Sequence, residues 1–250
     1  MLFVYKTKMI FLCIIPVYNE EARLPALIKK IKIFKKKKLK INFVFIDDKS
    51  SDNSIEIIKK NKMRYISKKR KLGIGHSLIF GLKLAIKEKY DAVIHLAGNG
   101  KMLPSEILQI IKPIKENNAD FVNGSRFLRG SKDYNTNPLS RIILIKILSL
   151  FISNLYKKRI TDATCGFRAF KCEIFKKKIK IFDQKKFYTY GYEYYSIGKV
   201  ISSNKLRFRE VPISMKYPKK GSYSKITPIV DWALMIGAWI YAIIDRKKID

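Results

Sequence analysis

Residues 10–20 read IFLCIIPVYNE, and residues 41–48 read INFVFIDD. Each segment is an apolar run that ends in a polar turn, which is the pattern of a buried strand. Similar runs recur along the first half of the chain. We therefore predict strands at Ile10–Val17, Ile41–Ile46, Met63–Ile66, Ala92–Leu96 and Phe121–Asn123. Because the runs are nearly continuous rather than alternating, we expect an α/β fold with a mostly parallel sheet flanked by helices on both faces.

The segments between these runs have the apolar spacing of helices. The predicted helices are Glu21–Phe34, Asn53–Lys60, Ile74–Lys87 and Ser105–Ile114. We expect one domain over residues 1–225, followed by a C-terminal helix in residues 226–250 that either lies at a membrane interface or packs on the domain. Ligands of such sheets bind beyond the carboxyl ends of the strands, so the functional residues should directly follow each strand.

The composition is that of a globular protein with an unusual charge. Hydrophobic residues make up 47% of the chain, and 53 Lys and Arg against 20 Asp and Glu give a formal net charge of +33. Such a surface attracts polyanions such as nucleic acid, anionic lipid or phosphorylated substrates, but a compositional bias toward Lys explains the excess equally well. No nucleic-acid motif accompanies the charge, so we expect no nucleic-acid partner.

Polar motifs follow the first two predicted strands. Residues 16–20 read PVYNE, and residues 47–54 read DDKSSDNS. Carboxylates and amides at adjacent strand ends suit a nucleobase edge and ribose hydroxyls, although Ser51 or Asp52 would also serve as helix N-caps. Further motifs follow in order: KLGIG at 71–75, GSRF at 124–127, DATCGFR at 162–168, EVP at 210–212 and GSYSK at 221–225. Together they resemble the dolichyl-phosphate mannose synthase-like branch of the family-two, GT-A-fold glycosyltransferases, over nearly the whole chain.

The resemblance implies an inverting transfer from a nucleoside-diphosphate sugar and assigns residues to it. The residues that match the nucleotide-sugar pocket are Pro16, Tyr18, Glu20, Asp48 and Gly73. Arg126 and Arg168 match basic residues that line the reaction site, where a planar guanidinium pairs well with phosphate. The structural alternatives are a plain glycine-rich turn for Gly73 and surface salt bridges for the two arginines.

One motif departs from the family. The resemblance implies an Asp-x-Asp motif, often followed by Gln two positions later, that holds Mg²⁺ or Mn²⁺ on the donor diphosphate. Ala97, Asn99 and Lys101 stand at these three places. Hard cations prefer carboxylate oxygens, and only the Asn99 amide remains as a candidate ligand. Three alternatives follow: weak metal binding through Asn99, replacement of the metal by the Lys101 ammonium, or a non-catalytic relative that binds nucleotide sugar or a partner enzyme.

The acceptor decides whether a general base is needed. A sugar hydroxyl on a lipid-linked or surface glycan must lose a proton to a base, whereas a polyprenyl phosphate is already ionised. The candidate bases within the motif-bearing segments are Asp162, Glu193 and Glu210. Abundant cations beside few acids favour the phosphate acceptor.

Two apolar segments point to a membrane surface. A helix needs about 20 apolar residues to span a bilayer. Leu139–Tyr156 is interrupted by Lys146, and Ile229–Ile244 is interrupted by Asp231, so neither is predicted to span. Trp232, Trp239 and Tyr241 and the flanking basic residues are typical of in-plane anchors on an anionic leaflet. We expect a cytoplasmic protein that is peripheral at the inner face of the membrane. Packing on the domain or a dimer seam is the alternative.

Overall fold

The computed structural model describes residues 9–37, 39–132, 139–217, 230–247 and 249. Its centre is a seven-stranded sheet with the strand order β3-β2-β1-β4-β6-β5-β7. The strands are β1 (Phe11–Val17), β2 (Ile41–Asp47), β3 (Tyr65–Ser67), β4 (Ala92–His95), β5 (Phe121–Ser125), β6 (Arg168–Lys171) and β7 (Phe208–Pro212). β6 is antiparallel to β4 and β5, and the other neighbours are parallel. The predicted mostly parallel sheet is confirmed.

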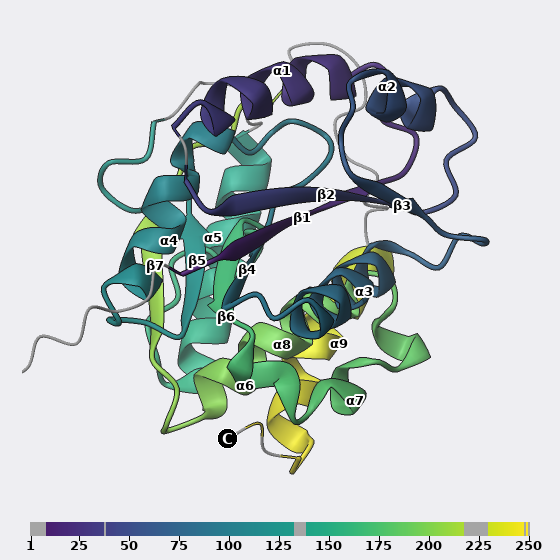
Figure 1. The fold of residues 1–250 in the computed structure, drawn as a ribbon. Helices are drawn as coiled ribbons and strands as arrows, with labels where there is room; N and C mark the ends of the chain where they lie inside the picture. Colours follow the sequence, from purple (N-terminus) through teal and green to yellow (C-terminus); the bar gives the residue numbers. More distant parts are fainter. Residues whose placement is uncertain (1–8, 38, 133–138, 218–229, 248, 250) are drawn as a thin grey trace, which may run out of the picture.

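Helices cover both faces of this sheet (Figure 1). They are α1 (Leu24–Lys35), α2 (Ser54–Lys60), α3 (Ile74–Lys87), α4 (Ile107–Lys115), α5 (Leu139–Tyr156), α6 (Glu173–Lys176), α7 (Ile179–Phe182), α8 (Gly191–Ser202) and α9 (Val230–Ile244). The predicted helix at 105–114 is divided into a 3₁₀ turn at Pro104–Glu106 and α4.

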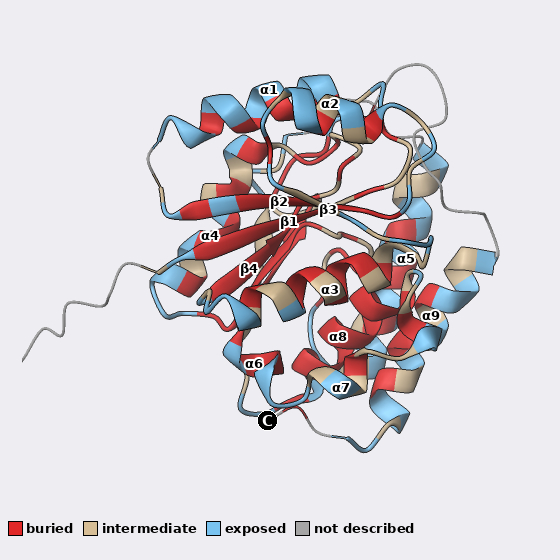
Figure 2. Ribbon diagram, turned by 45° about the vertical axis from the view of Figure 1, so that its right-hand side comes forward, coloured by how far each residue is buried: buried red, intermediate tan, exposed pale blue. Residues whose placement is uncertain are grey.

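The buried residues form two core clusters, one on each face of the sheet. Along β1, Leu12 and Ile14 belong to the cluster under α3, α5, α8 and α9, whereas Cys13 and Ile15 belong to the cluster under α1, α2 and α4. Figure 2 shows β1 buried between these two layers of helices. The apolar run at 10–17 is therefore continuous because successive side chains point into different cores.

The C-terminal helix α9 packs on α8. Trp239 is fully buried, and the carbonyl of Trp239 accepts a hydrogen bond of 2.7 Å from the Tyr156 hydroxyl of α5. Gly198 of α8 allows this close approach, because a Cβ there would lie 2.6 Å from the Cβ of Ala242. Lys199 donates to the carbonyls of Ala242 and Asp245 and so caps the end of α9. Trp239 is thus a core residue, and its expected place at a membrane boundary is wrong.

Helix α5 carries a wide exposed apolar face. Ile145, Leu148, Ser149 and Ile152 form its buried stripe. The large apolar side chains exposed on it are Leu139, Ile143, Leu144, Ile147, Leu150, Phe151 and Leu155. Among the described residues, α5 is the one helix whose length and composition suffice to cross a membrane, with 22% of it buried. Lys146 was predicted to make this segment too polar to span a bilayer. That prediction is wrong as far as length and composition go. The GSYSK motif and the expected boundary at residue 225 lie outside the described residues.

Candidate active site

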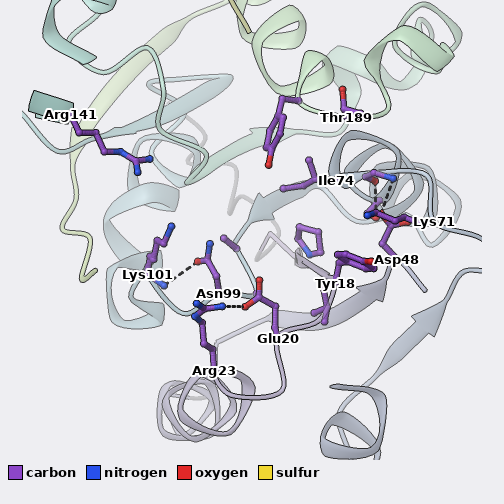
Figure 3. Close-up of a pocket in the computed structure, with 17 residues that line it drawn as sticks. Tyr18, Glu20, Arg23, Asp48, Lys71, Ile74, Asn99, Lys101, Arg141 and Thr189 are labelled. Atoms are coloured by element: carbon purple, nitrogen blue, oxygen red, sulfur yellow. Dashed lines mark hydrogen bonds and ion pairs between the residues drawn. The ribbon is translucent and has the colours of Figure 1, made fainter. Parts of the chain in front are cut away.

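A pocket of about 660 Å³ lies at the carboxyl ends of β1, β2 and β4 (Figure 3). Its lining contains Pro16, Val17, Tyr18, Glu20, Arg23, Asp48, Lys71, Gly73, Ile74, Ser77, Ala97, Gly98, Asn99, Lys101, Arg141, Thr189 and Tyr190. The five residues matched to the nucleotide-sugar pocket therefore line one cavity, together with Asn99, which was also predicted to contact the donor, and Lys101. This is the place where open parallel sheets bind ligands.

The two strand-end motifs hold each other in place. The backbone nitrogen of Asn19 donates to the Ser50 hydroxyl at 3.0 Å. In return, the backbone nitrogen of Ser51 donates to the side-chain oxygen of Asn19 at 2.8 Å. The backbone nitrogen of Glu20 donates to the buried Ser54 hydroxyl at 2.8 Å. These bonds tie the turn after β1 to the turn after β2, so one wall of the pocket is preorganised.

Asp48 positions the loop that leads into α3. Its carboxylate accepts the backbone amides of Leu72 and Gly73 at 2.8 and 2.7 Å, and it lies 2.6 Å from the Lys68 ammonium. Gly73 has a φ of 104°, a conformation that side-chain-bearing residues rarely adopt. Asp48 thus shapes the pocket through this loop as well as facing the cavity.

The N-terminus of α3 is covered by the chain. The backbone nitrogens of Gly75 and His76 donate to the carbonyls of Thr189 and Tyr188, at 2.8 and 3.0 Å. A helix N-terminus can bind phosphate through such free amides, but here protein carbonyls accept them. Positive charge for a diphosphate must therefore come from side chains.

Two cation contacts frame the pocket beside the sheet. The Lys71 ammonium lies 4.1 Å from the centre of the Tyr18 ring, and the Arg23 guanidinium donates to the Glu20 carboxylate at 2.9 Å. Figure 3 shows Tyr18 and Glu20 facing the cavity from the strand β1 side. A flat aromatic ring at this position suits stacking of a nucleobase.

A second cavity of about 140 Å³ continues from the pocket and shares Ala97, Asn99, Lys101 and Arg141 with it. The cations that line this cavity are Lys101, Arg126 and Arg141, and its one carboxylate among the described residues is Glu193. An anion in this second cavity would face three basic side chains.

Lys101 is 9% exposed, and its ammonium lies 5.2 Å from the centre of the Tyr217 ring. Burial, followed by the positive charges of Arg141 and Arg23, lowers the pKa of Lys101 to about 8. A ligand that brings negative charge to this place would raise this pKa and stabilise the charged form. The local electrostatics therefore favour an anion beside Lys101.

Arg126 and Asp162 form a buried bidentate ion pair. The Nε and Nη2 atoms of Arg126 lie 2.6 and 2.7 Å from the two carboxylate oxygens of Asp162. Arg126 also donates to the hydroxyls of Tyr217 and Thr164. Asp162 is fully buried and occupied by these bonds, so its carboxylate orients Arg126 toward the second cavity.

Arg168 and Glu193 differ in their access to the site. Arg168 is 1% exposed on β6, where it donates to the Asn123 side chain at 3.0 Å and to the backbone carbonyl of Glu193. Its side chain lies outside the lining of both cavities and supports the start of α8. Glu193 lines the second cavity, and burial raises the pKa of its carboxyl group.

Arg141 is a pocket residue that the motifs did not predict. It lies in the first turn of α5 and lines both cavities, and Figure 3 shows its guanidinium directed toward the space above Lys101. One feature of the sequence could have indicated Arg141, namely its position in the first turn of a predicted helix. A cation there is unfavourable next to the positive end of the helix dipole, unless an anion binds beside both. Tyr217, in contact with Arg126, carried no such signal.

The donor set at the place of the family's metal motif fits a divalent ion poorly. The Asn99 side-chain oxygen accepts the backbone amide of Lys101 at 3.2 Å, Ala97 offers no side-chain oxygen, and Lys101 is a cation. Across the described ranges of the chain, no cluster of three or more His, Cys, Asp or Glu residues is placed to hold a metal. Of the three motif positions, Asn99 is the one that offers a side-chain oxygen to an ion carried on the donor.

A family model described as glycosyl transferase family 2 matches residues 12–178. A UDP-N-acetylglucosamine–dolichyl-phosphate N-acetylglucosaminyltransferase of Methanococcus voltae is 28% identical over 84% of this chain and 86% of its own. A polyprenol monophosphomannose synthase of Mycolicibacterium smegmatis is 24% identical over 66% and 63% of the two chains.

A solved structure shares the fold. Glucosyl-3-phosphoglycerate synthase of Mycobacterium tuberculosis, with Mn²⁺, UDP and phosphoglyceric acid, matches with a TM-score of 0.68 and 15% identity over 95% of this chain and 78% of that one. A divalent ion is therefore consistent with the GT-A fold, although the donor set of this chain differs. The family match and the site geometry together confirm the resemblance drawn from the motifs: the chain belongs to glycosyl transferase family 2 and is a glycosyltransferase.

Proposed function

We propose that the protein transfers a sugar from a nucleoside-diphosphate sugar to the phosphate of a polyprenyl phosphate, with inversion at the anomeric carbon. The names of two relatives, which act on dolichyl phosphate and polyprenol, support a lipid-phosphate acceptor. The supporting observation in this chain is that Lys101 and Arg141 line both cavities and that Arg126 lines the second cavity beside them. Two anions must meet in this reaction, and cations at their junction reduce the repulsion between them.

The proposed step needs no general base. An ionised phosphate oxygen of the acceptor attacks the anomeric carbon, and the bond from that carbon to the donor diphosphate breaks on the opposite side. The electron pair of that bond leaves with the nucleoside diphosphate. Lys101 stabilises the charge that develops on the leaving diphosphate, while Arg126 and Arg141 hold the acceptor phosphate.

A sugar-hydroxyl acceptor is the second candidate, because Glu193 faces the second cavity with a raised pKa, as a general base does. Turnover of UDP and GDP sugars with short-chain polyprenyl phosphate or a glycan acceptor distinguishes the two. With a phosphate acceptor we expect Glu193→Gln to remain active. Consumption of a glycan alone, with Glu193→Gln inactive, would establish the second candidate, and no turnover at all would favour a non-catalytic binder.

We expect Tyr18→Ala to weaken nucleoside-diphosphate binding by roughly tenfold or more, because one stacked base contributes about 1–3 kcal/mol. Calorimetry with UDP and GDP measures the affinity, and it also identifies the nucleobase. The control is Tyr65→Ala, since Tyr65 lies on β3 outside the pocket lining. Equal affinity of wild type and Tyr18→Ala would remove Tyr18 from the base subsite. Asp48→Ala should weaken binding too, through the loop that it holds.

We propose further that the exposed face of α5 lies in the plane of an anionic membrane, at its cytoplasmic side. Its exposed apolar residues cover one side of the helix while its opposite stripe is buried in the domain, and Arg141 on the same helix reaches the pocket. A helix that lies in the interface would therefore bring the pocket close to a lipid-borne phosphate.

The double variant Ile147→Asn, Phe151→Asn tests this placement. We expect roughly tenfold or greater loss of binding to phosphatidylglycerol vesicles at high salt, since buried apolar surface resists salt whereas charge attraction does not. Vesicle co-sedimentation at low and high salt gives the readout. Ile33→Asn is the matched control, because Ile33 is 58% exposed on α1, over the other face of the sheet. Unchanged high-salt binding of the double variant would rule out α5 as the anchor.

A further inference from the structure

A basic groove, distinct from the two cavities of the active site, lies along the C-terminal half of α5. It has a volume of about 590 Å³ and is lined by Lys146, Ser149, Leu150, Ser153, Asn154, Lys157, Lys158, Arg159, Ile160 and Thr161. We infer that this basic groove binds the phosphate of an anionic lipid headgroup.

The charge of the groove supports an anionic ligand. Lys146, Lys157, Lys158 and Arg159 contribute four cations, and the described lining contains no carboxylate. Lys158 already donates to the carbonyl of Ile201 at 2.7 Å. Lys146, Lys157 and Arg159 are exposed, and the described part of the chain places no carboxylate in ion-pair distance of them. Part of this charge stabilises the C-terminus of α5, but one or two cations suffice for that purpose.

The position of the groove identifies a lipid as the source of the phosphate. Lys146 and Ser153 are seven residues apart and lie on one side of α5, and Lys157 directly follows the end of this helix. Leu150, which is 64% exposed, belongs both to the groove and to the exposed apolar face of the helix. Apolar surface beside basic and hydroxyl groups matches the boundary between acyl chains and headgroups.

No residue lines both the groove and either cavity of the active site. Arg141, at the pocket, and Asn154, in the groove, lie about 20 Å apart along the axis of α5, at a rise of 1.5 Å per residue. The groove is therefore separate from the pocket, and its occupant is a lipid other than the acceptor. A lipid headgroup in the groove and acyl chains against the exposed apolar face would fix α5 on the bilayer at two places. This inference rests on the membrane placement proposed above.

The test uses Lys157→Asn, Arg159→Gln in the full-length chain, with Lys158 left in place because it caps α8. Asparagine is chosen at 157 because Lys157 has a φ of 50°, which asparagine tolerates. The charge-matched control is Lys29→Gln, Lys30→Gln, since both residues are exposed on α1. Three ligands are compared: dihexanoyl phosphatidylglycerol below its micellar concentration, inorganic phosphate, and vesicles of phosphatidylcholine with or without phosphatidylglycerol.

We expect saturable binding of one dihexanoyl phosphatidylglycerol, weaker binding of inorganic phosphate, and loss of both in the groove variant alone. Vesicle affinity should fall about thirtyfold in the groove variant and change little in the control, since each nearby cation contributes about 1 kcal/mol. Equal binding of inorganic phosphate would overturn the lipid assignment. Absence of saturable binding, or equal loss in the control, would overturn the site. UDP affinity, measured on the same samples, shows whether the groove variant is folded and tests the proposed function separately.

Discussion

Replacing Lys101 by alanine is expected to lower turnover by a factor on the order of 10²–10³, because removal of one preorganised charge-stabilising group from a reaction site has an effect of this size. Lys101 is nearly buried at the junction of the two cavities, and the place of the metal-binding carboxylates holds Ala97 and Asn99. We therefore expect only weak dependence of the wild-type enzyme on Mg²⁺ or Mn²⁺. Turnover with EDTA, and with each ion restored, measures both effects.

Lys69→Ala is the control for Lys101→Ala, because Lys69 is an exposed cation close in sequence to the pocket loop but outside its lining. It should keep nearly full activity. Complete loss in EDTA with rescue by metal, alongside an active Lys101→Ala enzyme, would reverse the assignment and make Asn99 a metal ligand.

The pH dependence of activity tests separately whether the charged form of Lys101 is required. The pKa of Lys101 is lowered to about 8, first by burial and then by Arg141 and Arg23. Lys101 is cationic below that pKa, so kcat/KM should decline as the pH rises through about 8. The decline should be absent from the residual activity of Lys101→Ala. An unchanged alkaline limb in this variant would assign the titration to another group.

Replacing Trp239 by alanine is expected to destabilise the domain by about 3–5 kcal/mol, the usual result of truncating a buried Trp. Trp239 of α9 is fully buried against α8 and the Tyr156 ring, and the centres of the Trp239 and Tyr156 rings lie 5.3 Å apart. Denaturant unfolding measures the change in free energy. Trp232→Ala is the matched control, since Trp232 lies on the same helix but is only partly buried.

A loss in Trp239→Ala no larger than that in Trp232→Ala would show that α9 contributes little to the core. The prediction also bears on membrane experiments. A truncation that removes α9 would uncover α8, so a change in its membrane binding would not separate anchoring from unfolding. Substitutions on the exposed face of α5 avoid this ambiguity.

β1, β2, β4 and β5 were predictable because nearly all of their side chains are buried, which makes these segments largely apolar. β3 is only partly buried, and it overlaps its predicted segment in two residues. β6 and β7 were not predicted. β6 begins with the charged but fully buried Arg168, whose hydrogen bonds to Asn123 and Glu193 form only in the folded chain. β7 is an edge strand with the partly exposed sequence FREVP, and such a strand has no apolar signal.

The donor half of the site was predictable in the same way, since motifs placed after parallel strands meet at one edge of the sheet. The reaction half was less so. Arg126 and Arg168 both lie in recognised motifs, yet one lines a cavity and the other supports α8. That difference depends on which way each side chain points from its strand or loop. Arg141 comes from a helix far along the chain, and local pattern does not place it beside Lys101.

The dependence of α8 on α9 also has a consequence during synthesis of the chain. Helix α8 is buried along nearly its whole length, and β7 and α9 are translated after it. While those segments are still being made, the emerging polypeptide presents the apolar surface of α8 uncovered, next to a half-formed sheet with an open edge at β5. Such intermediates are prone to aggregate, so nascent chains should need a chaperone or an early encounter with lipid until α9 has docked.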